Sequence, residues 1–201
     1  MPKIILVSPG AGGKDTLANK FKEKGYNVCI PFTTRPIRKN ESNAKDYFFI
    51  TPEDFQDMLA EDEFLVHADF IGWHYGITHK QWANCDVFIM NLTFLSQLDS
   101  EDRNRSLVIY LDIPEETRKE RLLVRGDVDS VDRRLAADKE DFEDFLDYDI
   151  RITNLLIDRW ESAVGIPDDC FTNTVSLDQR RRQVLAKIAA RGLPNTNTMQ
   201  S

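Results

Sequence analysis

One short stretch near the start of the chain has the composition of a phosphate-binding loop. Residues 8–16 read Ser-Pro-Gly-Ala-Gly-Gly-Lys-Asp-Thr and follow an apolar run at residues 4–7. Glycines let backbone N–H groups turn inward around a phosphate, and the N-terminus of a following helix adds partial positive charge. Lys14 would reach the outer phosphates of a nucleotide such as ATP. The residues expected to contact phosphate are Gly10, Ala11, Gly12, Gly13, Lys14, Asp15 and Thr16.

This loop differs from the standard pattern G-x-x-x-x-G-K-[ST] at two positions. Ser8 replaces the first glycine, and Asp15 stands where a hydroxyl residue normally binds Mg²⁺. Two oxygen ligands are therefore available, because Thr16 can supply the hydroxyl or Asp15 can hold the metal directly or through water. The sequence leaves this choice open. ATP with Mg²⁺ is the expected phosphate donor.

The segments around the loop alternate between buried strands and helices. Short apolar runs predict strands at residues 4–7, 28–30, 47–50, 87–90, 107–113 and 150–152. Capping residues and apolar periodicity predict helices that begin near residues 14, 51, 114, 130 and 176, the first ending near Gly25 and the third at Gly126. This alternation indicates a single α/β domain over residues 1–192 with a parallel sheet covered on both faces, followed by a disordered tail at 193–201.

Composition excludes several classes of protein. The 201 residues carry a formal charge of −8, whereas binding to a nucleic-acid backbone needs clustered Lys and Arg. No apolar run approaches the roughly 18–20 residues of a membrane span, and the start lacks the pattern of a secretory signal. The three cysteines are widely spaced and odd in number, which favours reduced thiols. We therefore expect a cytoplasmic monomer or homodimer that binds a small anionic ligand.

Five further motifs follow the glycine loop in a fixed order. They are TTRPIR at 33–38, YFFI at 47–50, HYG at 74–76, RLLVRG at 121–126 followed by RRL at 133–135, and YDIRITN at 148–154. They resemble the guanylate kinase family over residues 3–154, whose patterns are T-T-R-x-x-R, Y-x-F, Y-Y-G, R-L-x-x-R-G…R-L and Y-D-x-x-I-x-N. The resemblance implies a three-layer P-loop NTPase fold. Its parts would be a core with a central parallel sheet, a small acceptor-binding insert at about 33–78 and a helical arginine lid at about 118–146.

The resemblance also implies how a phosphorylated acceptor is held. Arg35 and Arg38 would bind the acceptor phosphate, because the arginine fork matches phosphate oxygens in a way that lysine cannot. The hydroxyl groups of Tyr47 and Tyr75 would donate further hydrogen bonds to the same phosphate.

The lid motif implies a second group of phosphate-binding arginines. Arg118, Arg121 and Arg125 recur at i, i+3 and i+7, so they share one face of a helix, and Arg134 follows on the next helix. Phosphoryl transfer needs such groups to neutralise charge on the transferred phosphate. The residues that the resemblance assigns to catalysis are Lys14, Arg121, Arg125 and Arg134.

The chain departs from the family where guanine is recognised. Val66 stands at a glutamate position, Ile77 follows Y-G where the family has a hydrogen-bonding residue, and Pro31 stands at a serine position. Asn91 replaces an acidic residue on the central strand. A pocket that has lost hydrogen-bonding partners discriminates less between bases. We expect Val66, Ile77 and Asn91 to line the acceptor site, with relaxed selectivity for GMP.

The main prediction is an ATP-dependent, guanylate kinase-like phosphotransferase that converts a (deoxy)nucleoside monophosphate, nominally GMP or dGMP, to the diphosphate. Three features, the G-K-D-T ending, Asn91 and His67-Ala68, are also similar to ribose 1,5-bisphosphate kinase, so a sugar-phosphate kinase is an alternative. Some bacteriophage deoxynucleoside monophosphate kinases carry G-K-D-T, which suggests a divergent, phage-borne member. A non-catalytic binding module is the other alternative. Such modules typically lose the P-loop lysine and the lid arginines, which are present here.

Overall fold

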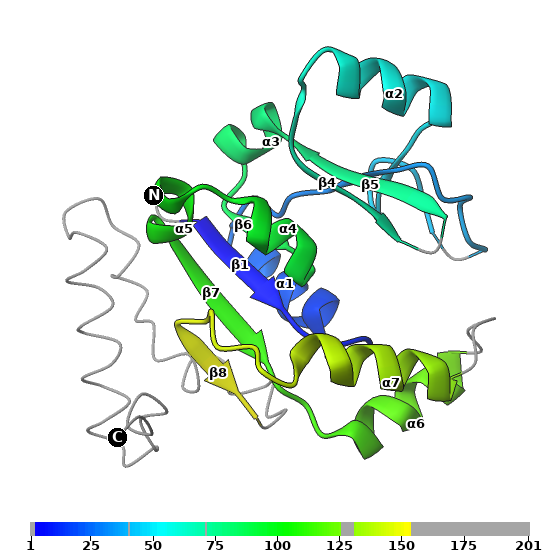
Figure 1. Ribbon diagram of the computed structural model, residues 1–201, viewed down its shortest axis with the longest axis vertical. Coiled ribbons are helices and arrows are strands. Elements are labelled where there is room, and N and C mark those ends of the chain that lie inside the picture. Colours follow the sequence, from blue (N-terminus) through cyan, green and yellow to red (C-terminus); the bar gives the residue numbers. More distant parts are fainter. Residues whose placement is uncertain (1–2, 40, 71, 126–130, 154–201) are drawn as a thin grey trace. The chain divides into compact units, whose positions relative to one another are not determined.

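The structure, a computed structural model, describes residues 3–39, 41–70, 72–125 and 131–153 (Figure 1). The chain forms two compact units. Unit 1 holds Ser8–Gly12 and the chain from Val108 onward, and unit 2 holds Lys3–Val7 and Gly13–Leu107. Unit 1 therefore contains the first half of the glycine loop and the lid, while unit 2 contains the rest of the loop and the acceptor insert.

A parallel strand pair forms the base of unit 2. Strand β1 (Lys3–Val7) runs parallel to β6 (Val87–Ile89), with Ile4 opposite Val87. Helix α1 (Lys14–Glu23) buries Leu17, Ala18 and Phe21. Gly25 has a φ of 87°, the left-handed conformation typical of the residue that follows a helix C-cap, so the predicted end of this helix is confirmed.

The predicted acceptor-binding insert, in unit 2, is a second, mixed sheet. Its strand order is β3 (Phe48–Phe49), β2 (Phe32–Thr33), β5 (Trp73–Thr78) and β4 (Phe64–Phe70), with β4 and β5 antiparallel. Helix α2 (Pro52–Ala60) lies over the β4–β5 hairpin (Figure 1), and the Phe55 ring stacks on Phe64 at 4.4 Å. The predicted start of α2 is confirmed by a capping box at Thr51 and by Pro52 in the first turn.

One predicted strand of unit 2 is wrong. Residues 28–30 form only an isolated bridge between Val28 and Val87. Instead of continuing a ladder, the carbonyl of Ile30 accepts a hydrogen bond from the Gln81 side chain at 2.6 Å. The remaining short helices of this unit are α3 (His79–Asn84), α4 (Leu92–Gln97) and α5 (Ser100–Asn104).

Unit 1 combines a second parallel pair with the lid helices. Strand β7 (Ser106–Leu111), which enters this unit at Val108, runs parallel to β8 (Ile150–Ile152). Helices α6 (Glu115–Arg125) and α7 (Val131–Phe142) lie side by side (Figure 1) and bury Leu122 and Leu135. Phe145 comes after the end of α7 and packs edge-on against Tyr110.

The parallel pairs and the alternating helices confirm the predicted α/β fold class. The predicted cap at Ser130, the helix from Ser176 and the tail at 193–201 lie outside the described residues. None of the described helices is both long and apolar enough to cross a lipid bilayer.

Candidate functional site

The glycine loop turns tightly between β1 and α1. Ala11 and Gly13 have positive φ angles of 58° and 92°, and Gly13 is the N-cap of α1. A glycine N-cap brings no side-chain acceptor to the N–H groups of the first helical turn, which is the arrangement that suits a bound phosphate. A Cβ atom on Gly12 would lie 2.3 Å from Ser8 Oγ and 3.0 Å from the carbonyl oxygen of Pro9, so only glycine fits there.

The three residues after the loop form the first turn of α1. Lys14 is half-buried, whereas Asp15 and Thr16 are exposed. A carboxylate and a hydroxyl are the oxygen ligands that Mg²⁺ accepts, so these two residues fit the metal by chemistry and by accessibility. The structure shows no preference between them.

Two lid arginines contact the glycine loop within unit 1. Arg121 Nη1 donates a hydrogen bond to the carbonyl oxygen of Ala11 at 2.9 Å. The Arg134 guanidinium lies beside Gly10, where an added Cβ would be only 3.1 Å from Nε. The backbone of Arg125 belongs to α6, but its side chain is outside the described part of the structure. The lid therefore places two cations beside Gly10 and Ala11, the part of the glycine loop that belongs to unit 1.

Arg118 has a different role from the one expected from helical spacing. Its Nε donates to the carbonyl of Ile113 at 3.1 Å, and its Nη1 donates to Asp138 Oδ2 at 3.0 Å. The residue is 5% exposed, so it anchors α6 instead of presenting its charge on the open face of the lid. Asp138 also accepts a hydrogen bond from Gly10 N at 2.9 Å. Sequence reasoning missed Asp138, although it lies one helical turn after Arg134.

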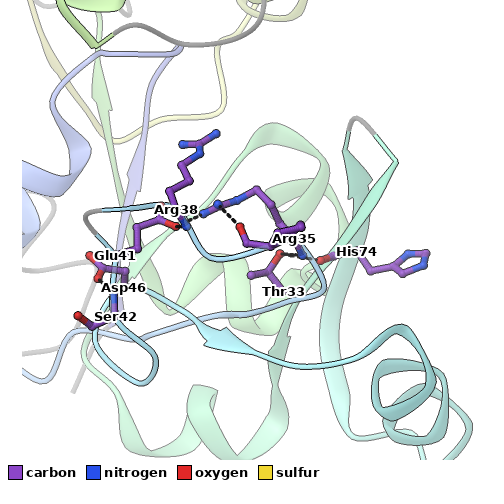
Figure 2. Close-up of polar contacts among 8 residues, drawn as sticks. Thr33, Arg35, Arg38, Glu41, Ser42, Asp46 and His74 are labelled. Carbon is purple, nitrogen blue, oxygen red and sulfur yellow. Dashed lines mark hydrogen bonds and ion pairs between the residues drawn. The ribbon is translucent and has the colours of Figure 1, made fainter.

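Arg35 is paired with a carboxylate that the sequence did not single out. Its Nη2 donates to both oxygens of Glu41, at 2.8 and 2.9 Å (Figure 2). The two side chains are 10% and 17% exposed. Burial disfavours both charges, yet the hydrogen bonds between them raise the pKa of Arg35 and lower the pKa of Glu41. Arg35 and Glu41 both lie outside any helix or strand, so no regular sequence pattern indicated that they would pair.

Aromatic side chains surround Arg35 within unit 2. Its guanidinium carbon lies 5.4 Å from the centre of the Tyr47 ring and 5.6 Å from that of Phe49. Tyr75 is next to Tyr47, with ring centres 6.0 Å apart. Burial, with smaller contributions from Tyr75 and the charge of Asp15, raises the pKa of Tyr47 to about 12. The structure therefore brings together Arg35, Tyr47 and Tyr75, three of the residues expected to bind the acceptor.

The backbone that carries Arg35 is fixed to strand β5. Thr33 Oγ1 donates to the carbonyl of His74 at 3.0 Å and accepts from the Arg35 N–H at 3.1 Å (Figure 2). Arg38 is exposed, and its backbone N–H donates to Glu41 Oε2 at 2.9 Å. Glu41 thus organises the loop that contains both predicted phosphate-binding arginines.

The three residues expected to line the base pocket have packing and capping contacts in this structure. Val66 and Ile77 face each other across the β4–β5 ladder, and both are 0% exposed. Asn91 caps α4, its Oδ1 accepting from Phe94 N at 2.8 Å. Contact of these residues with an acceptor remains a prediction.

Comparison with known proteins gives a consistent result. The family model described as "Guanylate kinase" matches residues 1–164. The guanylate kinase of Koribacter versatilis is 32% identical over 175 residues, covering 80% of this chain and 73% of that protein. The guanylate kinase of Nitrosospira multiformis is 28% identical over 169 residues, covering 77% and 79%.

A solved structure agrees at the level of the fold. The crystal structure of guanylate kinase from Anaplasma phagocytophilum has a TM-score of 0.64 and 22% sequence identity, and 96% of each chain is covered. The family model spans most of the sequence, and the glycine loop, the paired Arg35 and the lid arginines occur in the order of that family. This chain therefore belongs to the guanylate kinase family and is a P-loop nucleotide kinase.

Proposed function

We propose that this enzyme transfers the γ-phosphoryl group of ATP to GMP or dGMP, forming the nucleoside diphosphate and ADP. The observation that carries the proposal is the approach of Arg121 and Arg134 to the glycine loop in unit 1. A scaffold that only binds a partner has no use for cations at a donor-phosphate site. The names of the relatives supply the nucleotide class of the acceptor.

The donor phosphates would be held by the loop and by Lys14. The N–H groups at the N-terminus of α1 favour bound anions, whereas the Gly10 N–H donates to Asp138. An oxygen of the acceptor phosphate attacks the γ-phosphorus, and the bond from that phosphorus to the oxygen of departing ADP breaks. Arg121, Arg125 and Arg134 would neutralise charge that is spread over the transferred group. Transfer is direct, so no covalent enzyme intermediate is needed.

Asp15 or Thr16 would hold Mg²⁺. When bound, the metal neutralises charge on the outer phosphates of ATP. Both side chains lie on the exposed side of the first turn of α1, beside Lys14. A carboxylate at position 15 would bring a full negative charge to the metal, where a hydroxyl brings only a dipole.

The acceptor phosphate would be bound by Arg35 and Arg38, with hydrogen bonds from Tyr47 and Tyr75. A pKa of about 12 keeps the Tyr47 hydroxyl protonated, and hence able to donate, over the whole physiological range. Arg35 already lies over two aromatic rings, and an anion would share or displace its partner Glu41.

Recognition of the base should be less strict than recognition of the phosphate. An unpaired polar group buried against apolar side chains such as Val66 and Ile77 costs about 1–3 kcal/mol. Guanine carries several such groups on one edge. We therefore propose GMP and dGMP as acceptors with a relaxed range, in a cytoplasmic enzyme that is a monomer or homodimer and does not act on nucleic acid.

A coupled assay of ADP formation tests this function. The full chain is supplied with ATP, Mg²⁺ and one acceptor from a panel of all NMPs, dNMPs and ribose phosphates. We expect turnover with GMP or dGMP, lost in Lys14→Ala, while the thermal unfolding of that variant is unchanged. Turnover with ribose phosphates alone would indicate a sugar-phosphate kinase. No turnover with any acceptor would indicate a binding module.

A further inference from the structure

Asp138 joins the lid helix α7 to the glycine loop. One of its oxygens, Oδ2, accepts from Gly10 N at 2.9 Å and from Arg118 Nη1 at 3.0 Å. The Asp138 side chain is 17% exposed and that of Arg118 is 6% exposed. All of these groups belong to unit 1.

The contact between helix and loop leaves little room for a side chain at position 10. A Cβ atom there would be 3.0 Å from Asp138 Oδ2 and 3.1 Å from Arg134 Nε. Arg134 and Asp138 are four residues apart on α7, so they project from the same face of the helix. The hydrogen bond that fixes Asp138 against Gly10 therefore also sets the distance of Arg134 from the loop.

A carboxylate beside a phosphate site would ordinarily repel the substrate. Here Arg118 cancels that charge, and its other hydrogen bond, to the carbonyl of Ile113, fixes it to the start of α6. Neither Asp138 nor Arg118 is exposed enough for water to take over this pairing. The loop thus gains a strong, charge-assisted acceptor for Gly10 N–H without added net negative charge.

We propose that Asp138 is a positioning residue for phosphoryl transfer. It fixes the position of Arg134 relative to Gly10 and does not itself contact substrate. This role rests on the proposed kinase function. It predicts a defect in the chemical step and not in acceptor binding, because Arg35 and Arg38 are fixed by Glu41 and Thr33 instead.

Substitution of Asp138 distinguishes a defect in the chemical step from a defect in acceptor binding. Asp138→Ala removes both hydrogen bonds, and misplacement of catalytic groups by about 1 Å costs on the order of 100-fold in rate. We therefore expect kcat to fall about 100-fold, with the KM for GMP within about twofold of wild type. Asp138→Asn keeps an acceptor oxygen and should recover part of kcat. Glu140→Gln, which removes an exposed carboxylate from the same helix, is the matched control and should behave as wild type.

Two further measurements exclude a merely structural role. The double variant Arg118→Met, Asp138→Leu removes both buried charges together. It therefore lacks the unpaired buried cation that Asp138→Ala alone would leave. Thermal unfolding should then return towards wild type while kcat stays low. The ¹⁵N-labelled protein provides a readout without turnover, since the Gly10 amide proton should shift upfield in Asp138→Ala and not in Glu140→Gln.

Recovery of kcat in the double variant would overturn the proposal, as would wild-type kcat or an unmoved Gly10 amide in Asp138→Ala. Failure of the wild-type enzyme to phosphorylate any acceptor is a separate result. It would refute the kinase function. The Gly10 resonance would still report whether Asp138 holds the loop.

Discussion

Removal of the Glu41 carboxylate should destabilise the protein and make its stability depend on bound anion. Glu41 accepts two hydrogen bonds from Arg35, at 2.8 and 2.9 Å, and one from the backbone N–H of Arg38 at 2.9 Å. In Glu41→Ala the Arg35 guanidinium would keep its aromatic neighbours but lose its counter-ion. A half-buried cation would then be left uncompensated.

The size of the effect follows from burial. Loss of one partner from a fully buried ion pair costs about 3–5 kcal/mol. Here the side chains are 10% and 17% exposed, and Arg35 can turn partly to solvent, so a cost of about 2 kcal/mol is expected. For a chain of this length that corresponds to a fall in Tm of roughly 4–8 °C.

An acceptor phosphate can replace the lost carboxylate. GMP should therefore raise the Tm of Glu41→Ala by more than it raises that of wild type, because it restores a counter-ion that wild type already has. Thermal unfolding by circular dichroism, with and without GMP and with inorganic phosphate as a second ligand, measures both effects. The matched control is Glu101→Ala, which breaks an ion pair with Arg105 whose side chains are 77% and 71% exposed and should change Tm very little.

The reasoning fails if Glu41→Ala unfolds at the same temperature as Glu101→Ala. It also fails if GMP stabilises the Glu41 variant and the wild-type protein equally, because Arg35 would then not be the group that the phosphate neutralises.

Three other predictions concern the loop, the metal and a thiol. Gly12→Ala should lose about 1–3 kcal/mol of unfolding free energy through overpacking against Ser8. In the double variant Ser8→Gly, Gly12→Ala, chemical denaturation should show that part of the lost unfolding free energy is regained. If none is regained, the strain does not come from Ser8. Asp15→Ser should retain turnover, whereas Asp15→Ala should need more Mg²⁺; equal Mg²⁺ titrations in all three proteins would remove Asp15 from the metal site. The hydrogen bond from Cys29 lowers the pKa of Cys85 to about 7, so its thiolate forms at lower pH than in an ordinary cysteine. Alkylation of Cys85 by iodoacetamide, followed by mass spectrometry, should reach half its maximal rate near pH 7 and shift to higher pH in Cys29→Ala; a midpoint that the Cys29 change leaves in place would contradict this cause.

Local signals in the sequence were enough to predict the strand and the helix on either side of the glycine loop, and the start of α2. The continuous apolar run before Ser8 is typical of a strand buried on both faces, and Gly25 marks the end of α1 because a left-handed conformation follows the helix there. Thr51 and Pro52 fix the start of α2 in the same way. In each case the physical cause lies within a few residues of the feature it determines.

Features that depend on distant partners could not be predicted. The alternation of buried and exposed residues in β4 depends on its pairing with β5. Residues 28–30 do not form a strand, because the Gln81 side chain donates to the Ile30 carbonyl, which a strand ladder would use. Asp138 meets Gly10 across a separation of 128 residues, and no local pattern indicates that contact. The arginines could be assigned to phosphate binding from their motifs. Which of them are restrained by protein carboxylates could not.

The two internal carboxylates explain how arginines can be concentrated in a chain with a net charge of −8. Like charges at a phosphate site repel one another before the substrate binds. In each unit a carboxylate reduces this repulsion by pairing with one of the arginines. In unit 1, Asp138 neutralises Arg118 and leaves Arg121 and Arg134 beside the loop. In unit 2, Glu41 neutralises Arg35 itself, so an acceptor phosphate must share or displace a bidentate partner. Part of the binding free energy of the acceptor then offsets the loss of the hydrogen bonds between Arg35 and Glu41. This should weaken ground-state binding of any monoanion and favour a dianionic phosphate, whatever base or sugar it carries.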